Sequence, residues 1–263
     1  MNINATKPLV SVIFVTYKRH HLLKRTLDSL LENTDYPRSR LELIVCDDGS
    51  DSETQAEIRK MPFDRYCLSL KNQGMGANTN RGLRLAEGDF ILQLQDDWLC
   101  LGPSYWLDVA ICCLREREDV GLIRLRTPCN TGGVNITLSD GRTCSIYGPA
   151  HYESNQEYGY TDNPHVKTRA FVRDVGYYRE DLSMPETEIE YCRRVDQQTK
   201  WKVGWLEGMS IFEHIGADET FNPCNIRARR LAYLSKIPGA DKMLAVARRT
   251  KATLISRFNN STR

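Results

Sequence analysis

The sequence lacks the features that mark membrane-spanning and secreted proteins. No apolar run approaches the roughly 20 residues that cross a bilayer. The opening residues, MNINATKPLVSVIFV, show no basic segment followed by a long apolar segment and a small-residue cleavage site. These absences predict a cytoplasmic protein, soluble or peripheral to the membrane.

Other features that the sequence lacks argue against particular classes of site and ligand. The nine cysteines contain no CxxC pair, so a zinc site built on paired cysteines is not expected. Their scatter favours reduced thiols that pack as small hydrophobic residues, as at Cys46 and Cys113. A formal net charge of +2 argues against a nucleic-acid binder. The glycine-rich stretch KNQGMGANTNRG has no GxGxxG pattern, which disfavours a nicotinamide enzyme.

The first half of the chain alternates apolar runs with helical patterns, which is typical of βαβ units and a parallel sheet. VSVIFV is a continuous β-branched run suited to a strand buried on both faces. Leucines from Leu22 to Leu31 then follow helical spacing. The predicted strands cover residues 10–15, 41–46, 66–70 and 90–94, and further helices are predicted near 53–60 and through Leu83 and Ala86.

The second half is more irregular. Apolar spacing predicts a helix around Trp106 to Leu114 and another over about 187–198. TGGVNITLSDGRTCSIYG predicts a hairpin that turns at Ser139-Asp140-Gly141. GLIRLR and KVGWLEG are interpreted as strands, and SIFEHIG follows as a further segment. DNPHVKTRAF is interpreted as a basic loop, which is either solvated or shapes the acceptor or phosphate side.

Between Asn225 and Arg263 ten basic residues face a single acid, Asp241. Apolar side chains from Leu244 to Phe258 can share one helical face. This pattern predicts a helical extension that either docks on the protein core or contacts an anionic membrane or acidic partner. Residues 1–223 are expected to form the main domain, with halves at about 9–100 and 101–223, and residues 224–263 the basic extension.

Polar side chains gather where the predicted strands end. Because the carboxyl ends of parallel strands meet at one edge of a sheet, these residues should line one crevice. An aromatic ring, hydroxyls and paired carboxylates there suit a nucleotide and a divalent cation, although DDGS is also a common turn and helix cap. The residues are Thr16, Tyr17, Asp47, Asp48, Asp96 and Asp97.

Three stretches together resemble a known family. VSVIFVTYKR, IVCDDGSDSET and NQGMGANTNRGLRLAEGDFILQLQDDW look like the nucleotide-binding half of the inverting glycosyltransferase family 2, which has the GT-A fold. The resemblance covers residues 9–100 well and 165–216 more loosely. It implies an α/β, Rossmann-like, mostly parallel central sheet flanked by helices, and a sugar transfer from a nucleotide-diphosphate sugar to a hydroxyl acceptor.

The resemblance also assigns roles in the first half. Tyr17 would lie against the base, with Asp48 and its neighbour Asp47 contacting the base or ribose. Asp96 would approach the ribose and Asp97 would hold Mn²⁺ or Mg²⁺. Thr16 and Asn80 complete the expected nucleotide-binding set. The family's DxD signature has an acid where this chain has Gln95, which lowers the negative charge expected at the cation site.

In the second half the resemblance implies a catalytic base at the start of a helix. MPETEIEYCRRV has the local form of the family's ED motif without its letters. Counting back from Arg194 gives Glu188, with Glu186 as the alternative. His214, in SIFEHIG, resembles a position that meets the metal or the diphosphate. Acids in the first turn of a helix are also favoured by the helix dipole without any catalytic role.

The resemblance thus implies a metal-dependent inverting glycosyltransferase of the hexosyltransferase type. A UDP-sugar donor and a glycan, lipid-linked or protein hydroxyl acceptor are expected, with no nucleic-acid partner. A nucleotidyltransferase and a catalytically inactive nucleotide- or carbohydrate-binding protein remain the alternatives. Trp98, next to the carboxylates, is expected to anchor their loop in the core.

Overall fold

The computed structural model describes residues 7–126, 133–147, 160–197, 201–206 and 208–216. Contacts divide the chain into Met1–Gly216 and Ala217–Arg263. All described residues belong to the first of these units. The predicted basic extension, residues 224–263, lies outside the described residues, so its boundary and helical form stay predictions.

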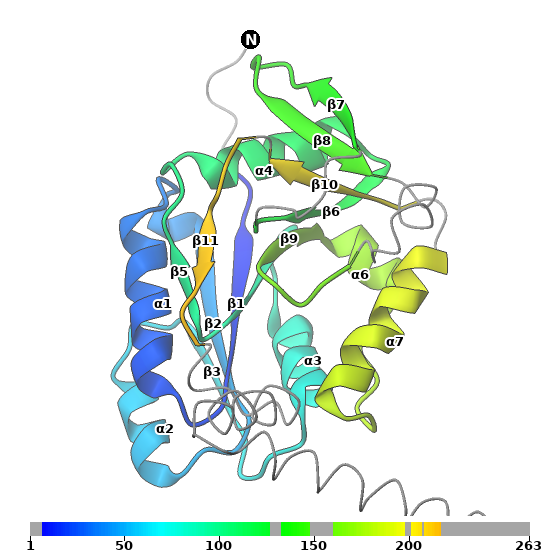
Figure 1. The fold of residues 1–263 in the computed structure, drawn as a ribbon. Coiled ribbons are helices and arrows are strands. Elements are labelled where there is room, and N and C mark those ends of the chain that lie inside the picture. The colour runs from blue at the N-terminus through cyan, green and yellow to red at the C-terminus, as the bar shows by residue number, and fades with distance from the viewer. Residues whose placement is uncertain (1–6, 127–132, 148–159, 198–200, 207, 217–263) are drawn as a thin grey trace, which may run out of the picture. The chain divides into compact units, whose positions relative to one another are not determined.

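A nine-stranded sheet forms the centre of the described unit, in the order β3-β2-β1-β4-β9-β6-β10-β8-β7 (Figure 1). The strands are β1 Val10–Thr16, β2 Leu41–Asp47, β3 Arg65–Leu68, β4 Phe90–Gln95, β6 Val120–Arg124, β7 Val134–Thr137, β8 Thr143–Tyr147, β9 His165–Thr168 and β10 Lys202–Leu206. β1 to β4 are parallel, as are β6 and β10. β9 runs antiparallel between β4 and β6. The hairpin β7–β8 pairs antiparallel with β10.

Helices cover both faces of this sheet because its strands are apolar on both sides. Val12 and Phe14 of β1 pack with leucines of α1 and with residues of α2 and α4, whereas Ile13 and Val15 pack with residues of α3, α6 and α7. Alternate residues of one strand thus belong to two separate cores. The helices are α1 His20–Glu32, α2 Ser52–Arg59, α3 Met75–Leu85, α4 Trp106–Glu116, α6 Arg169–Val175 and α7 Met184–Gln197, with a 3₁₀ turn η1 at Arg38–Arg40.

Most predicted elements are confirmed within a few residues. The hairpin turns where predicted, with Gly141 at φ 85°. Cys46 and Cys113 are fully buried, as expected of thiols that fill the core. A second, two-stranded sheet was not predicted: β5 Trp98–Cys100 pairs antiparallel with β11 Phe212–His214. It brings the segment after β10 back to the end of β4.

The interpretation of DNPHVKTRAF as a solvated basic loop is wrong. His165 and Lys167 lie in β9 with no exposed surface, and Arg169 begins α6. This strand was missed because its sequence is polar, and a lysine is rarely buried unless it is paired. The side chain of Arg169 instead donates hydrogen bonds to the backbone oxygens of Ala86 and Gly88, which fixes α6 against the start of β4.

Lys167 belongs to a buried polar cluster on the α7 side of the sheet. Its Nζ donates to Gln93 Oε1 at 2.8 Å and lies 5.5–6.0 Å from the ring centroids of Tyr160, Tyr178 and Tyr191. Tyr160 donates its hydroxyl proton to Asp162 Oδ1 at 2.5 Å. Burial raises the pKa of Asp162 to about 7 and lowers the pKa of Lys167 to about 7, against the attraction between the two charges. This cluster joins β4, β9 and α7 through polar contacts inside the core.

The lowered pKa of Lys167 predicts a pH-dependent stability. The folded protein releases this proton near pH 7, whereas the unfolded chain holds it up to about pH 10.4. Between these values the unfolded chain binds more protons, so the contribution of Lys167 to the free energy of unfolding rises with pH; below pH 7 it is flat. Urea unfolding of wild type and Lys167→Met should therefore show a difference in unfolding free energy that shifts in favour of wild type between pH 7 and pH 9.

The matched control is Lys60→Met, which removes an exposed lysine that pairs only with Glu57. Its difference from wild type should change little over the same pH interval. A pH-independent difference for Lys167→Met would show that Lys167 stays protonated in the folded protein.

Candidate functional site

The carboxyl ends of three neighbouring strands place the candidate site. Thr16 of β1 lies opposite Asp47 of β2, and Val15 lies opposite Gln95 of β4. Asp96 and Asp97 follow β4 directly, at the same edge. Thr16 Oγ1 donates a hydrogen bond to Asp96 Oδ2 at 2.7 Å. The register of the parallel strands thus brings the predicted hydroxyl and carboxylate into contact.

The turn that carries the two acids is held from both sides. On the α1 side, Thr26 Oγ1 donates to Asp96 O at 2.8 Å and accepts from Trp98 N at 3.1 Å. On the other side, Ile215 N donates to Asp97 O at 2.9 Å. A Cβ atom on Gly216 would stand 2.3 Å from Asp97 Oδ2, so glycine lets the backbone pass directly over this carboxylate. Asp97 is therefore fixed in position before any ligand arrives.

Trp98 anchors the loop, as expected. Its side chain is buried, and its Nε1 donates to Gln95 Oε1 at 3.2 Å. Its ring centroid lies 4.8 Å from that of His214, which is its register partner in the β5–β11 sheet. The same pairing brings His214 Nε2 to 3.3 Å from Asp97 Oδ2. The structure thus brings together two residues predicted from segments more than a hundred positions apart.

Arg19 balances part of the negative charge of the acid pair, and it was not among the predicted site residues. Its Nη1 donates to Asp97 Oδ2 at 2.9 Å and its Nε to Asp96 Oδ2 at 3.2 Å, while Nη2 pairs with Asp96 Oδ1. Arg19 is the N-cap residue of α1, two residues after Tyr17. Its place in the quoted motif VTYKR, directly after a strand end, was the available signal.

The two carboxyl groups differ in acidity. Burial raises the pKa of Asp96 to about 6, against the attraction of Arg19. Burial also disfavours the charge of Asp97, but hydrogen bonding from His214 and the charge of Arg19 outweigh it and leave the pKa of Asp97 below its usual value. Asp97 is therefore the more strongly ionised acid at neutral pH.

Asp47 and Asp48 organise the loops around the site. Asp47 Oδ2 accepts from Ser50 N at 2.9 Å and from Gln55 Nε2 at 2.8 Å, which stabilises the turn into α2. Asp48 accepts from Gln73 N at 3.0 Å and Gly74 N at 2.8 Å, which fixes the loop into α3. The structure thus shows the turn-forming use of DDGS, while contact with a nucleotide stays a prediction.

Tyr17 and Asn80 differ in their access to the site. Tyr17 is half-buried, with Lys18 Nζ 5.1 Å from its ring centroid. Asn80 is buried, and its amide donates to Tyr178 O and Glu180 Oε1, each at 2.9 Å. Its Oδ1 accepts from Tyr178 N at 2.9 Å. Asn80 therefore fixes the segment before α7, and nucleotide contact by this residue stays a prediction.

The two glutamates offered as catalytic base occupy different environments on α7. Glu186 is exposed, and its Oε2 accepts from Ser183 N at 3.1 Å and Ser183 Oγ at 2.7 Å. The bond from Ser183 N is the glutamate half of a capping box, which accounts for Glu186 without catalysis. Glu188 Oε1 accepts from Asp162 N at 3.1 Å and Thr161 Oγ1 at 3.2 Å. Within the described residues, no hydrogen bond to its other oxygen is found.

Asp97 and His214 are suited to share a divalent cation with a ligand. Among the described residues, no group of three or more His, Cys, Asp or Glu side chains is arranged to hold a metal. Asp97 Oδ1, however, is buried and has no hydrogen-bond partner. Mg²⁺ is commonly bound through one or two carboxylates together with substrate phosphates. The residues present therefore fit a cation whose remaining ligands come from a diphosphate.

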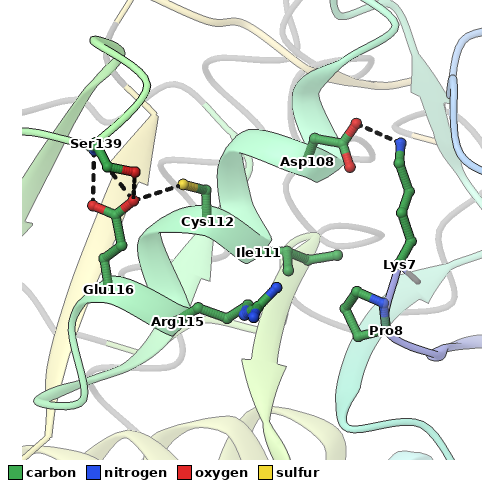
Figure 2. A pocket seen from close by; sticks show the side chains of 8 residues that line it. All are labelled: Lys7, Pro8, Asp108, Ile111, Cys112, Arg115, Glu116 and Ser139. Atoms are coloured by element: carbon green, nitrogen blue, oxygen red, sulfur yellow. Dashed lines mark hydrogen bonds and ion pairs between the residues drawn. The ribbon is translucent and has the colours of Figure 1, made fainter. Parts of the chain in front are cut away.

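A separate pocket of about 440 Å³ lies along α4 and contains none of the predicted site residues (Figure 2). Three of its charged side chains are engaged: Lys7 Nζ pairs with Asp108 Oδ2 at 2.7 Å, and Glu116 Oε2 accepts from Ser139 N at 2.9 Å. The acids at the carboxyl edge of the sheet remain the better candidate site.

No helix within the described ranges combines the length and apolar character needed to cross a membrane. The predicted membrane contact concerns residues 224–263, which lie outside those ranges.

Comparisons with known proteins agree with this geometry. Residues 11–119 match the family described as Glycosyl transferase family 2. A Campylobacter jejuni GalNAc(5)-diNAcBac-PP-undecaprenol beta-1,3-glucosyltransferase is 36% identical over 95 residues, which are 34% of this chain and 30% of that protein. The Escherichia coli chondroitin synthase is 35% identical over 146 residues, which are 53% of this chain and 20% of that protein. The chain thus spans about a third or less of these two relatives.

Solved structures extend the likeness beyond the matched residues. The S. aureus TarS structure in complex with UDP-GlcNAc has a TM-score of 0.60 and 19% identity, over 81% of this chain and 62% of that one. The Pyrobaculum calidifontis mannosyltransferase PcManGT, in complex with GDP-Man and Mn²⁺, has a TM-score of 0.54 and 18% identity, over 76% of this chain and 55% of that one. At such identities the likeness shows the fold alone. Together, the match over residues 11–119 and the likeness of fold support a glycosyltransferase family 2-like protein with the GT-A fold.

Proposed function

We propose that the chain is a metal-dependent inverting glycosyltransferase that moves a sugar from a nucleotide-diphosphate sugar to a hydroxyl acceptor. The observation that carries this proposal is Asp97, which is held rigidly, paired with His214, and left with one buried oxygen that has no partner. An ionised oxygen fixed in this way is prepared for a cation rather than for a protein donor.

In this proposal Asp97 and His214 hold Mn²⁺ or Mg²⁺ beside the diphosphate. The bound cation would supply charge stabilisation to the departing diphosphate. Tyr17, half-buried at the same edge, offers a face for the base, and Thr16 and Asp96 mark the side on which the ribose would lie. Asp48 would reach the nucleotide through the loop that it fixes at Gln73 and Gly74.

Glu188 is proposed as the general base that takes the proton from the acceptor hydroxyl. Thr161 and the backbone of Asp162 orient one of its oxygens, which leaves the other for the acceptor. The acceptor oxygen would then attack the anomeric carbon from the face opposite the leaving diphosphate, which inverts the configuration. The capping role of Glu186 supports this choice between the two acids.

A UDP-sugar donor and a lipid-linked acceptor are the narrower part of the proposal. The TarS complex contains UDP-GlcNAc, and the C. jejuni relative is named for an undecaprenol-linked substrate. PcManGT was solved with GDP-Man, so guanosine is the competing nucleotide. The basic residues between Asn225 and Arg263 suit contact with the anionic membrane that would present such an acceptor.

Asp97→Asn should abolish the metal dependence of nucleotide binding, because it removes the charge while keeping the shape. Calorimetric titration with UDP and with GDP, each with and without Mn²⁺, should show at least a roughly tenfold loss of affinity with Mn²⁺ present, the scale of a lost charge-assisted contact. Asp108→Asn, in the pocket along α4, is the control and should bind as wild type. Unchanged Mn²⁺-dependent binding by Asp97→Asn would remove Asp97 from the site.

Glu188→Gln should lower kcat by about 10² or more, the usual scale for loss of a general base, with little change in the KM for the donor. Steady-state transfer assays measure both constants, with a sugar donor that carries whichever nucleotide, UDP or GDP, binds more tightly. Glu190→Gln is the control, because Glu190 lies on the same helix and pairs with Arg194. A kcat close to wild type would exclude Glu188 as the base, and a loss in Glu186→Gln instead would reassign it.

Replacing Arg248, Arg249 and Lys251 with Gln should weaken binding to anionic vesicles. Each basic residue near such a surface contributes about 1 kcal/mol, so loss of three should weaken binding about 10²-fold in co-sedimentation with phosphatidylserine vesicles. The control is neutral phosphatidylcholine vesicles, to which both proteins should bind weakly. Equal binding of the two proteins to anionic vesicles, or none by wild type, would contradict the membrane contact.

A further inference from the structure

Arg19 supplies a positive charge to Asp96 and Asp97, the same two acids that a metal ion would contact. Its guanidinium makes a forked contact with Asp96 and a further bond of 2.9 Å to Asp97 Oδ2. The Arg19 side chain is 15% exposed, against 0% for Asp96 and 7% for Asp97. Three charges are thus gathered where water screens them weakly.

The hydrogen bonds of Asp96 and Asp97 determine which of their carboxylate oxygens are left to bind a metal ion. Thr16 and Arg19 engage both oxygens of Asp96. Arg19 and His214 share Asp97 Oδ2. Of the four carboxylate oxygens of Asp96 and Asp97, only Asp97 Oδ1 is buried without a hydrogen-bond partner among the residues that the structure describes. A divalent cation on Asp97 would therefore stand next to a guanidinium that already balances part of the negative charge.

This conflict cannot be relieved by proton release, because arginine keeps its charge at every physiological pH. Two changes would relieve it. The guanidinium can move away from Asp97, or a second anion can enter with the cation. A nucleoside diphosphate is such an anion, and its oxygens can accept hydrogen bonds from arginine as well as bind the metal.

We propose that Arg19 is a resident counter-cation of the acid pair, which competes with the divalent cation for Asp97 and makes cation binding depend on the diphosphate. This inference rests on the proposed function, since it assigns the cation and the diphosphate to this site. Arg19 keeps the affinity for the metal alone low. The donor's negative charge then compensates the guanidinium, so that cation and nucleotide bind together.

The test compares Mn²⁺ binding by wild type and Arg19→Gln without nucleotide, using electron paramagnetic resonance of free Mn²⁺ and calorimetry. Arg19→Gln should bind Mn²⁺ about tenfold or more tightly, because one positive charge beside the ion is gone. Lys24→Gln is the matched control: it removes one positive charge from the same helix, where Lys24 is exposed and pairs with Asp28. It should bind Mn²⁺ as wild type does. Equal or weaker binding by Arg19→Gln would overturn the proposal.

Two further variants separate charge competition from mere support of the loop. Arg19→Lys keeps the charge but loses the fork, so it should bind Mn²⁺ as weakly as wild type. Tight binding by Arg19→Lys would assign the effect to geometry and overturn the proposal. The double variant Arg19→Gln/Asp97→Asn should lose the gained affinity; a gain that persists would place the ion elsewhere and overturn it too.

Wild type alone provides a measurement that does not depend on the folding of any variant. After correction for the Mn²⁺–UDP complex in solution, UDP should raise the affinity of wild type for Mn²⁺ by about tenfold or more, and Mn²⁺ should raise the affinity for UDP by the same factor. Independent binding of the two would overturn the proposal. If wild type neither binds a nucleoside diphosphate nor transfers sugar, the proposed function fails, whereas the Mn²⁺-only comparison still decides the role of Arg19.

Discussion

The carboxylate of Asp96 is completely buried at the end of β4, and the arrangement of the site follows from the need to satisfy it. An ionised carboxylate removed from water is costly unless it is paired and hydrogen-bonded. Thr16, at the end of β1, donates to it, and Arg19, at the start of α1, supplies the positive charge. These contacts fix β1, α1 and β4 relative to one another, and they place the neighbouring carboxylate of Asp97 at the same edge.

Asp97 differs from its neighbour because the chain returns to it from far away. The β5–β11 sheet brings His214 beside its carboxylate and passes Gly216 over it. The second half of the chain thus contributes directly to the proposed cation site, besides carrying Glu188, the proposed base, on α7. The buried cluster around Asp162 and Lys167 links β4, which leads to the acids, with the loop that orients Glu188. Donor and acceptor sides are in this way tied to the same strand.

The fold of the first half of the chain was predicted well from the sequence because its signals are local. Runs such as VSVIFV and LELIVC are apolar enough to be strands buried on both faces, and the parallel register then brings Thr16 and Asp96 together. The family resemblance placed His214 near the metal or the diphosphate, but its contact with Asp97 was not predicted. Pairing over such a separation depends on a three-residue strand that carries no periodic signal of its own.

The two polar residues that sequence analysis missed, Lys167 and Arg19, were missed for one physical reason. Each is buried because partners distant in the sequence satisfy its charge. Lys167 reads as solvated until Gln93 and Asp162 are known to face it. From the sequence, Arg19 looks like an ordinary surface arginine after a strand, because the two acids that bind it lie almost eighty residues later. Asn80 and Asp47 were predicted to bind the nucleotide, but in the structure their side chains are hydrogen-bonded within the protein. For Asp47, the alternative interpretation of DDGS as a turn describes what is observed.

The central claim is that a divalent cation and a nucleoside diphosphate meet at Asp97. It is tested most directly by Mn²⁺-induced broadening of backbone amide signals in the NMR spectrum of the protein with UDP bound. The account predicts selective broadening at Asp97 itself, at Gly216, which passes over its carboxylate, and at Thr16, which donates a hydrogen bond to the neighbouring Asp96. Signals of Asp108 and Ser139, in the pocket along α4, should stay sharp. Broadening confined to that pocket, or none at the carboxyl edge at saturating Mn²⁺ and UDP, would contradict the account.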